Sequence, residues 1–570
     1  MWEMLCRSGR TTSFMAANIV LRISASKLGV AEYFPFAIFS SPRRSWRIGV
    51  AGIMIREQSC WIELSAIAAR ASAVHSALVR EMKLHRRICP MFAWHLQNGL
   101  PLVAWLLLAI VSQLAPSASA IAEESQRPAR PNIVLVFIDD MGWADLSCFG
   151  NTEAETPNID RMAREGIAFE QFYVNSPICS PSRVAISTGQ YPQRWSITSY
   201  LADRDKNRQR GMADWLDPAA PMLARALKED GYATGHFGKW HMGGQRDVDD
   251  APPISAYGFD ASLTNFEGMG AKLLPLTLVP GQNKPGRIWV DAERLGGPVR
   301  WMQRSKITGG FAEAAETFIE HAQAEGKPFY INLWPDDVHS PFYPPVDKWR
   351  EGKRGIFLAV LEEADRQLGV LFDYIRENKR LRDNTLVLIC SDNGHEPGAG
   401  AAADLKGSKG QLYEGGVRSP LIVWGPGLIA KNATGSRNKK SVIAAIDLVP
   451  SLEALSGVKH LDAPCDGQDL LPVLLGRSDA SRDGPLFFSR PPHRKHYDQF
   501  KNLPDLAVRQ GDWKLLCDVD GSREQLYNLK SDRGETKNRV VNEPQIAADL
   551  KQKLLDWYHA MPIGKSDARK

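Results

Sequence analysis

Cysteine is scarce in this chain, and its spacing excludes two kinds of structural site. The 570 residues include eight cysteines, five of which lie beyond residue 120: Cys148, Cys179, Cys390, Cys465 and Cys517. They form no CxxC pair and no zinc-type spacing, so we expect neither a disulfide framework nor a structural zinc site. One or two disulfides could still form in an oxidising compartment.

Most of the chain also lacks an excess of charge of one sign. Residues 1–120 contain 13 Lys and Arg against 5 Asp and Glu, although the whole chain has a formal net charge of +5. The remaining residues therefore carry 57 basic and 60 acidic side chains, a net charge of −3. Because this balance provides no basic surface, we expect no nucleic-acid partner. Any recognition of an anion has to come from a local site.

The hydrophobic runs do not reach membrane-spanning length. The apolar run 102–111 follows a basic stretch at 82–87 and precedes Ala118-Ser119-Ala120, a small-residue cleavage site. This order is typical of a secretory signal peptide over 82–120, and the run is shorter than the roughly 20 residues that cross a bilayer. We therefore expect a periplasmic or secreted protein without a permanent membrane anchor. Residues 1–81 carry no usable motif and are interpreted as a gene-calling extension before Met82.

What the chain does have is an alternation of buried strands and helices. Continuous β-branched and aromatic runs at 132–138, 328–333 and 385–390 are typical of parallel strands that are buried on both faces. Helical stretches, including 221–230 and 356–378, lie between the runs or beside them. The alternation predicts an α/β fold with a large mixed or parallel central sheet flanked by helices.

Domain boundaries follow from changes in this pattern. We expect the main domain at 131–455, with long loops in the Gly- and Pro-rich segment 244–308. Further on, 507–515 and 524–529 are typical of antiparallel strands, and a helical stretch over 544–559 follows them. We therefore expect a smaller C-terminal domain, at 456–570, made of antiparallel sheet plus helix.

Oxygen-bearing side chains follow two of the predicted buried strands. Asp139 and Asp140 end the first, and Asp392 and Asn393 end the third. Ligands bind beyond the carboxyl ends of the strands in such sheets, and a set of oxygen donors favours one Ca²⁺, or less well Mg²⁺, over zinc. The alternative is that each Asp pair caps a turn or a helix. That alternative explains one pair better than it explains both.

One cysteine begins a distinctive sequence, Cys-Ser-Pro-Ser-Arg-Val-Ala-Ile-Ser-Thr-Gly, from Cys179 to Gly189. Arg183 follows by about one helical turn, so the two side chains share a helix face near a terminus that favours anions. The alternative is a structural cysteine before a Ser-Pro turn. The whole sequence resembles the signature of the type I, formylglycine-dependent sulfatases of the alkaline-phosphatase-like superfamily. The resemblance implies that a maturation enzyme oxidises Cys179 to formylglycine.

Further segments carry the same resemblance. The sequence Gly-Tyr-Ala-Thr-Gly-His-Phe-Gly-Lys-Trp-His-Met-Gly at 231–243 is similar to the family's second signature. It implies that Lys239 binds a sulfate oxygen and that His241 is a general base. His339 matches the histidine that contacts the leaving oxygen. Lys409 matches the lysine that binds sulfate and helps to protonate the leaving alcohol.

The resemblance also implies the metal ligands and the charge of the site. The family's calcium ligands are matched by Asp139, Asp140, Asp392 and Asn393, and residue 179 completes the set. With the metal ion, the side chains of Arg183, Lys239 and Lys409 would form a cationic cradle around one anionic group.

The resemblance implies a sulfuric ester hydrolase, and sulfated carbohydrate is the expected substrate by analogy with exported members. Candidate substrate contacts on loops beside the catalytic groups are Arg246, Asp247, Asp336 and Asp337, each of which could equally be a structural loop charge. One alternative is a formylglycine-dependent phosphodiesterase or phosphonate monoester hydrolase, because a phosphodiester carries the same single charge. Another is a non-catalytic glycan-binding protein, if Cys179 stays a thiol.

Overall fold

The computed structural model describes residues 130–245, 247–458, 463–490 and 502–562, together with two short strands nearer the N-terminus. The chain divides into two compact units, residues 1–122 and residues 123–570. In the first unit, β1 (Ile38–Ser40) pairs antiparallel with β2 (Trp46–Ile48). The predicted signal peptide at 82–120 lies outside the described residues.

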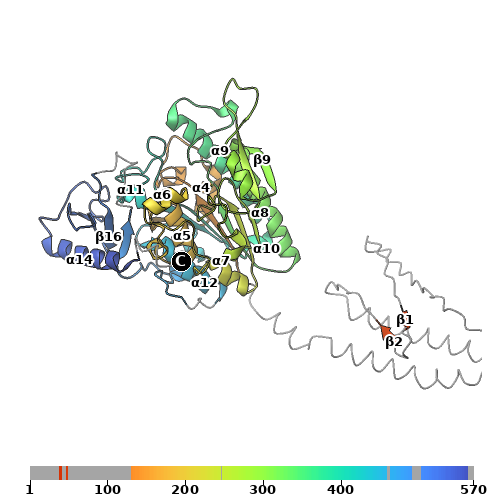
Figure 1. Ribbon diagram of the computed structural model, residues 1–570. Helices are drawn as coiled ribbons and strands as arrows, with labels where there is room; N and C mark the ends of the chain where they lie inside the picture. Colours follow the sequence, from red (N-terminus) through yellow and green to blue (C-terminus); the bar gives the residue numbers. More distant parts are fainter. Residues whose placement is uncertain are drawn as a thin grey trace, which may run out of the picture. The chain divides into compact units, whose positions relative to one another are not determined.

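A nine-stranded mixed sheet forms the centre of the second unit (Figure 1). Its order is β13-β4-β12-β11-β3-β10-β5-β6, and β14 also pairs with β4. The strands from β11 to β6 run parallel, whereas β12 runs antiparallel to both of its neighbours. The strands are β3 (Asn132–Ile138), β4 (Ile167–Tyr173), β5 (Ala233–Gly238), β6 (Ala261–Leu263), β10 (Phe329–Trp334), β11 (Thr385–Ser391), β12 (Arg418–Trp424), β13 (Ser436–Asn438) and β14 (Ile443–Ala444).

Helices cover both faces of this sheet, which confirms the predicted α/β class. Val134 and Val136 of β3 pack in one core with side chains of α4, α8 and α9, whereas Leu135 and Phe137 pack in a second core with side chains of α5, α7 and α12. Successive side chains of a strand point to opposite faces, so a strand covered on both sides has to be apolar throughout. The helices are α4 (Pro157–Glu165), α5 (Cys179–Thr188), α7 (Leu223–Glu229), α8 (Ile307–Ala324), α9 (Gly352–Glu377) and α12 (Ala445–Ser456).

The segment 244–308 is more regular than the sequence predicts. It contains a separate three-stranded sheet of order β8-β7-β9, in which β7 runs parallel to β9 and antiparallel to β8. The expectation of long loops was therefore wrong for these strands. These strands are short and contain or adjoin Gly or Pro, which weakens their pattern in the sequence. They are β7 (Lys272–Thr277), β8 (Gly286–Arg287) and β9 (Val299–Gln303).

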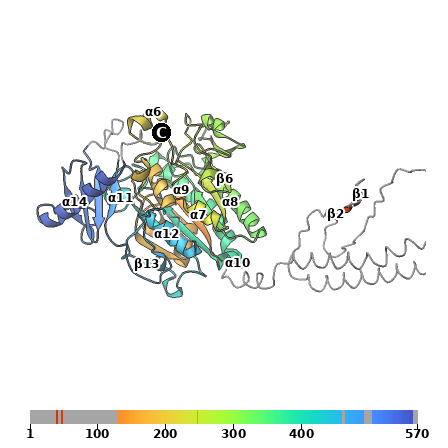
Figure 2. The same ribbon diagram turned by 60° about the horizontal axis from the view of Figure 1, so that its bottom comes forward.

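A four-stranded antiparallel sheet and a long helix form the C-terminal part, as predicted. The strands pair in chain order, and α14 lies beside them (Figure 2). Its Ala547, Leu550 and Leu554 share a core with side chains of the strands. The elements are β15 (Leu486–Ser489), β16 (Leu506–Gln510), β17 (Trp513–Cys517), β18 (Gln525–Asn528) and α14 (Pro544–Ala560). Shorter helices elsewhere in the unit are α6 (Arg204–Gln209), α10 (Lys379–Arg382), α11 (Glu414–Val417) and α13 (Leu471–Leu474).

The described residues also bear on disulfide bonds and on membrane-spanning helices. Their five cysteines are all unpaired, so the disulfides that the sequence left open are not formed among them. Among the described residues, no helix is both long enough and apolar enough to cross a membrane.

Candidate active site

The carboxyl ends of neighbouring parallel strands bring the predicted oxygen ligands together. Because β3 pairs with β11, Asp139 and Asp140 lie beside Asp392 and Asn393. The backbone N–H of Asp140 donates to Asp392 Oδ1 at 3.1 Å, and Asn393 Nδ2 donates to Asp140 Oδ1 at 2.7 Å. All four side chains are fully buried. Four oxygen-bearing side chains thus meet at one edge of the sheet.

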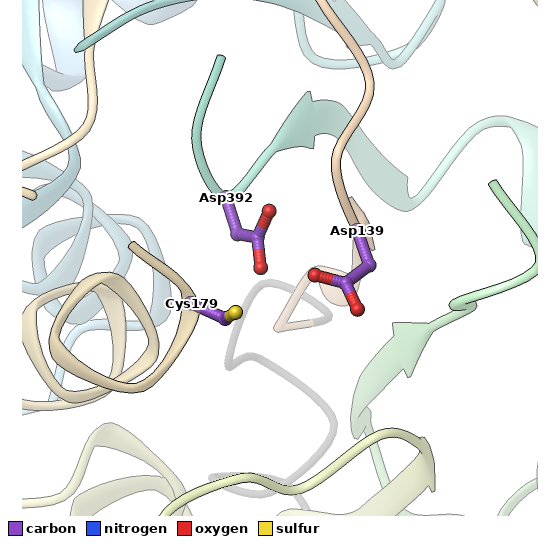
Figure 3. Close-up of side chains that lie close together, drawn as sticks. All are labelled: Asp139, Cys179 and Asp392. Carbon is purple, nitrogen blue, oxygen red and sulfur yellow. The ribbon is translucent and has the colours of Figure 1, made fainter. Parts of the chain in front are cut away.

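Helix α5 places Cys179 against these strand ends. The helix begins at Cys179 and is buried along its whole length. Pro181 fits its first turn because backbone N–H groups there have no partner within the helix. Figure 3 shows the Cys179 side chain close to the carboxylates of Asp139 and Asp392, and one ligand atom from each of the three residues lies within 4.8 Å of the others.

The Arg183 guanidinium, one turn along α5, bridges the two strand ends. Its Nη2 atom lies 2.9 Å from Asp392 Oδ2 and 3.2 Å from Asp139 Oδ1. Its central carbon lies 5.2 Å from the centroid of the Trp334 ring. Burial opposes the charge, but the two carboxylates raise the pKa of Arg183 above its ordinary value. The guanidinium is therefore a permanent cation at the base of the site.

Two lysines add positive charge from other elements. Lys239, which follows β5, has its Nζ 2.6 Å from Asp139 Oδ2, and Lys409 Nζ lies 2.6 Å from Asp140 Oδ2. Burial works against both charges, but these carboxylates raise the pKa of each lysine. Burial also works to raise the pKa of the Cys179 thiol, but Lys239 and Lys409 lower it below its ordinary value. The surroundings of Cys179 therefore favour negative charge.

The two carboxylates beside Cys179 have opposite pKa shifts. Burial works to raise the pKa of Asp139, but Lys239, His339 and Arg183 hold it well below its ordinary value. Burial and the adjacent Asp139 charge raise the pKa of Asp392 well above its ordinary value. A second negative charge is costly here, and a bound cation would reduce that cost.

The acceptor atoms fit a hard divalent cation. Asn393 Oδ1 is buried and accepts no hydrogen bond from the described residues. A buried carbonyl-type oxygen of this kind is costly unless it gains a partner. Together with the carboxylates of Asp139, Asp140 and Asp392, it provides the oxygen donors that Ca²⁺ and Mg²⁺ prefer.

Two histidines lie at different depths. His241 is buried, and its Nε2 lies 3.1 Å from the carbonyl oxygen of Leu201. Burial lowers its pKa to about 4, so the ring is neutral near pH 7. His339 is half-buried, with Nε2 3.6 Å from Asp140 Oδ2. Its Nδ1 lies 2.6 Å from the carbonyl oxygen of Ser340.

The structure adds Glu267, which no pattern in the sequence singled out. Its carboxylate is only 1% exposed, and its Oε1 lies 3.2 Å from His241 Nε2. Burial raises the pKa of Glu267 to about 7, against the effect of His241 and Lys239. A lone acidic residue in a Gly-rich segment carries no spacing signal, so sequence reasoning had no means of finding it.

The four predicted substrate contacts have different surroundings. Arg304 Nη1 lies 2.7 Å from Asp336 Oδ1 and 3.7 Å from Asp337 Oδ1, and both carboxylates are buried. Asp247 is exposed, and its Oδ2 accepts a hydrogen bond from the backbone N–H of Arg204. Arg246 lies outside the described residues.

Known proteins are similar in sequence to this chain over most of residues 123–570. The sequence model of the Sulfatase family matches residues 131–458. Arylsulfatase A of Homo sapiens is 29% identical over 468 residues, which cover 78% of this chain and 84% of that protein. N-acetylgalactosamine-6-sulfatase of Canis lupus familiaris is 31% identical over 402 residues, which cover 68% of this chain and 72% of that protein.

The fold is shared with solved structures as well. The crystal structure of Ps i-CgsB in complex with k-i-k-neocarrahexaose has a TM-score of 0.61 with this chain at 26% identity, and the match covers 75% of this chain and 92% of that one. The residues that the family model matches include β3 and β11, which Asp139 and Asp392 follow, and the helix that begins at Cys179. This chain therefore belongs to the sulfatase family and is a sulfatase with the alkaline-phosphatase-like fold.

Proposed function

We propose that this sulfatase removes sulfate from a sulfated carbohydrate by means of formylglycine at position 179 and one bound Ca²⁺. The observation that carries the proposal is the position of Cys179. It begins a buried helix and lies within 4.8 Å of carboxylate oxygens of Asp139 and Asp392. The charges of Lys239 and Lys409 lower the pKa of its thiol, against the effect of burial. A thiol with only a packing role needs no such concentration of charge.

Oxidation of residue 179 would allow it both to attack the sulfur of the substrate and to release sulfate afterwards. The hydrate of an aldehyde has two hydroxyl groups on one carbon. One hydroxyl oxygen attacks sulfur and displaces the alcohol. The other then loses its proton, its electron pair forms the C=O bond, and the C–O bond to sulfate breaks. A serine could attack in the same way, but it would leave a stable sulfated enzyme.

The oxygen donors at the strand ends would hold the cation. Asp139, Asp140, Asp392, Asn393 and residue 179 are the proposed ligands. Bound there, a divalent ion would polarise the S–O bonds of the substrate and offset its negative charge. Ca²⁺ suits the site better than Mg²⁺, because Mg²⁺ usually keeps several of its own waters.

The remaining side chains would bind the sulfate and move protons. Arg183, Lys239 and Lys409 would contact sulfate oxygens, and because the fold already holds them in place, little reorganisation is needed during the reaction. His339 would contact the leaving oxygen, and Lys409 would help to protonate it. His241, which is neutral near pH 7, would accept the proton from the second hydroxyl of residue 179.

The relatives support a carbohydrate substrate. N-acetylgalactosamine-6-sulfatase is named for a sulfated sugar, and Ps i-CgsB was solved with k-i-k-neocarrahexaose. Of the predicted substrate contacts, Asp247 is exposed and would be accessible to a substrate. Asp336 and Asp337 are buried beside Arg304, so they would support the site from behind its surface. Arg246 stays a prediction.

Burial of residue 179 supports a maturation step before folding. Cys179 is 3% exposed in the folded chain, so a maturation enzyme has to reach it before α5 packs against the sheet. The signal peptide would then place the folded sulfatase in the periplasm or outside the cell.

Replacement of Cys179 by Ala tests the proposal. We expect Cys179→Ala to abolish hydrolysis of an aryl sulfate while the free energy of unfolding changes little. The matched control is Cys517→Ala, which also removes a buried thiol but in the C-terminal sheet, and it should keep its kcat. Intact-mass measurement of native protein should show a mass about 18 Da below that of the cysteine form.

Other results would overturn the proposed chemistry or favour one of the alternative functions. Full activity in Cys179→Ala, or an active native protein with an unmodified thiol, would overturn the proposed chemistry. A much higher rate on a bis-aryl phosphate than on the aryl sulfate would favour the phosphodiesterase alternative. Binding of a sulfated saccharide without turnover, by protein that retains the thiol, would favour the glycan-binding alternative.

A further inference from the structure

We propose that Glu267 is the positioning residue of the general base: it holds His241 in one tautomer and stabilises the imidazolium ion formed as sulfate is released. The inference rests on the proposed function, in which His241 accepts a proton from residue 179. It adds a buried carboxylate behind the base, supplied by the loop between β6 and β7.

The contacts of His241 decide which ring nitrogen carries the proton. Its Nε2 lies 3.1 Å from the carbonyl oxygen of Leu201 and 3.2 Å from Glu267 Oε1. A carbonyl oxygen can only accept a hydrogen bond, so Nε2 is the protonated nitrogen of the neutral ring. Its Nδ1 is buried and has no hydrogen-bond partner among the described residues. Nδ1 is thus the nitrogen with a free lone pair, available to a group of the substrate-bound site.

Gln245 fixes the position of the Glu267 carboxylate relative to the His241 ring. Its Nε2 donates to Glu267 Oε1 at 2.5 Å and to the Leu201 carbonyl oxygen at 2.9 Å. The same two oxygens therefore receive hydrogen bonds from Gln245 and face Nε2 of His241. This shared arrangement limits rotation of the imidazole, as carboxylate or carbonyl partners do for other functional histidines.

A close approach of two loops brings Glu267 to His241. Gly244 and Gly268 both have positive φ, and a Cβ atom added to Gly244 would lie 3.0 Å from the backbone of Gly268. Only glycine allows this approach without strain. The second loop is also tied from within, because Lys272 Nζ donates to the carbonyl oxygens of Gly268 at 2.5 Å and Gly270 at 3.0 Å.

The charges around His241 show what Glu267 contributes. The charged groups that act on the ring are Glu267, Lys239 and Arg183, and the two cations lower the pKa of His241, as burial does. An imidazolium ion beside two fixed cations is unfavourable. Glu267 is the acidic group that works in the opposite direction, so it lowers the free energy of the protonated ring.

The step that depends on this pair is sulfate release. The free hydroxyl of the sulfated hydrate gives its proton to His241 Nδ1. The O–H electron pair forms the C=O bond, the C–O bond to sulfate breaks, and sulfate leaves with that electron pair. His241 then gives the proton to solvent, and addition of water restores the hydrate. No oxidant or reductant takes part.

The substitution Glu267→Gln tests the proposal at a pH above 7, because it keeps the shape of the side chain and removes the charge that Glu267 carries above its pKa of about 7. We expect kcat for an aryl sulfate to fall on the order of 100-fold, the range of general-base effects. The kcat/KM should stay within about threefold, since it reports the steps up to release of the alcohol. Rapid mixing should show a burst of about one alcohol per active site, followed by slow turnover.

Two controls separate positioning from folding. Asp365→Asn changes another buried carboxylate, which accepts hydrogen bonds from the backbone of Asn158 and Ile159 at the start of α4. It should lower the free energy of unfolding without producing a burst. If Glu267→Gln does not fold, Glu267→Asp keeps the charge but withdraws it from the ring, and it should show a smaller fall in kcat with the same burst.

The outcomes distinguish this inference from the proposed function. Unchanged kcat and no burst in Glu267→Gln, in active protein whose residue 179 is modified, would overturn the role of Glu267 alone. An equal fall of kcat and kcat/KM would also overturn it, because the defect would then precede alcohol release. A native protein without activity on any sulfate ester would instead overturn the proposed function.

Discussion

The side chains of Asp139, Asp140 and Asp392 are fully buried and stand beside three cations, those of Arg183, Lys239 and Lys409. Burial and the adjacent Asp139 charge disfavour the ionised form of Asp392 as long as no cation is bound beside it. A sulfate ester brings a further negative charge into this buried site, and a divalent cation on the carboxylates would offset it. The residue-scale electrostatics thus support a metal-dependent enzyme.

Removal of the metal should therefore affect both activity and stability. We expect a chelator to lower kcat strongly and to reduce the free energy of unfolding, because a ligand at roughly 100 times its Kd contributes about 2.7 kcal/mol. Added Ca²⁺ should restore both quantities, and Mg²⁺ should restore them less well. Activity assays and denaturant unfolding before and after chelation provide the measurement.

The substitution Asp392→Asn is the matched control for that experiment. It keeps the size of a proposed ligand but removes its charge, so Ca²⁺ should stabilise this variant much less than the native chain. Equal stabilisation of both proteins by Ca²⁺ would contradict binding at the strand ends.

At the scale of secondary structure, the end of β5 has to lie very close to the end of β10. Gly238 has a φ of 123°, and a Cβ atom added there would lie 2.1 Å from the carbonyl oxygen of Trp334. The next residue, Lys239, donates its backbone N–H to that same oxygen at 2.9 Å. The glycine thus allows the chain to turn the lysine side chain toward Asp139.

The substitution Gly238→Ala should disturb this turn. We expect a loss of at least about 3 kcal/mol in the free energy of unfolding, as for other severe backbone clashes, and a fall in kcat/KM because Lys239 moves. The control is Gly326→Ala, where φ is also positive at 67° but no heavy atom lies within 4 Å of the added carbon. That variant should lose only about 1 kcal/mol and keep its activity.

At the scale of the whole unit, a buried charge network joins the C-terminal sheet to the catalytic part. Lys514 of β17 has its Nζ 2.9 Å from Glu414 Oε1 and 3.1 Å from Glu535 Oε1, and all three side chains are fully buried or nearly so. Glu414 begins α11, and a Cβ atom added to Gly394 would lie 2.0 Å from the carbonyl oxygen of Gly415 in the same helix. The network therefore helps to hold α11 in place against the turn that contains Asn393.

The substitution Glu414→Gln should leave two buried cations, Lys514 and Arg418, with less compensation, because both pair with this carboxylate. We expect a loss of about 3 to 5 kcal/mol in the free energy of unfolding. Burial works to raise the pKa of Glu414, but Lys514 and Arg418 lower it to about 2. Its contribution is thus present above the ordinary carboxyl pKa of about 4.5 and is lost as the pH falls toward 2. Denaturant unfolding at several pH values should show less acid destabilisation in the variant than in the native chain.

An exposed ion pair provides the comparison. Lys553→Met removes the partner of Asp549 on the surface of α14, and it should change the free energy of unfolding by less than about 0.5 kcal/mol. An equally small change in Glu414→Gln would show that the network does not stabilise the junction.

The sequence alone was sufficient for the parts of this protein that depend on local order along the chain. Apolar runs such as 132–138 identify strands buried on both faces, and chain direction places Asp139 and Asp392 at the same edge of a parallel sheet. The spacing of Cys179 and Arg183 puts both on one helix face. Each strand and each helix face in these conclusions is identified from residues that are near one another in the sequence.

Only the tertiary structure decided the contacts between loops. Glu267 reaches His241 because the backbones of Gly244 and Gly268 approach closely, and no periodicity records such an approach. In the same way, Asp336 and Asp337 lie beside Arg304, which the sequence does not connect with them. Strand and helix patterns repeat every few residues, whereas loop contacts depend on how distant segments pack, and that information becomes available only once the chain is folded.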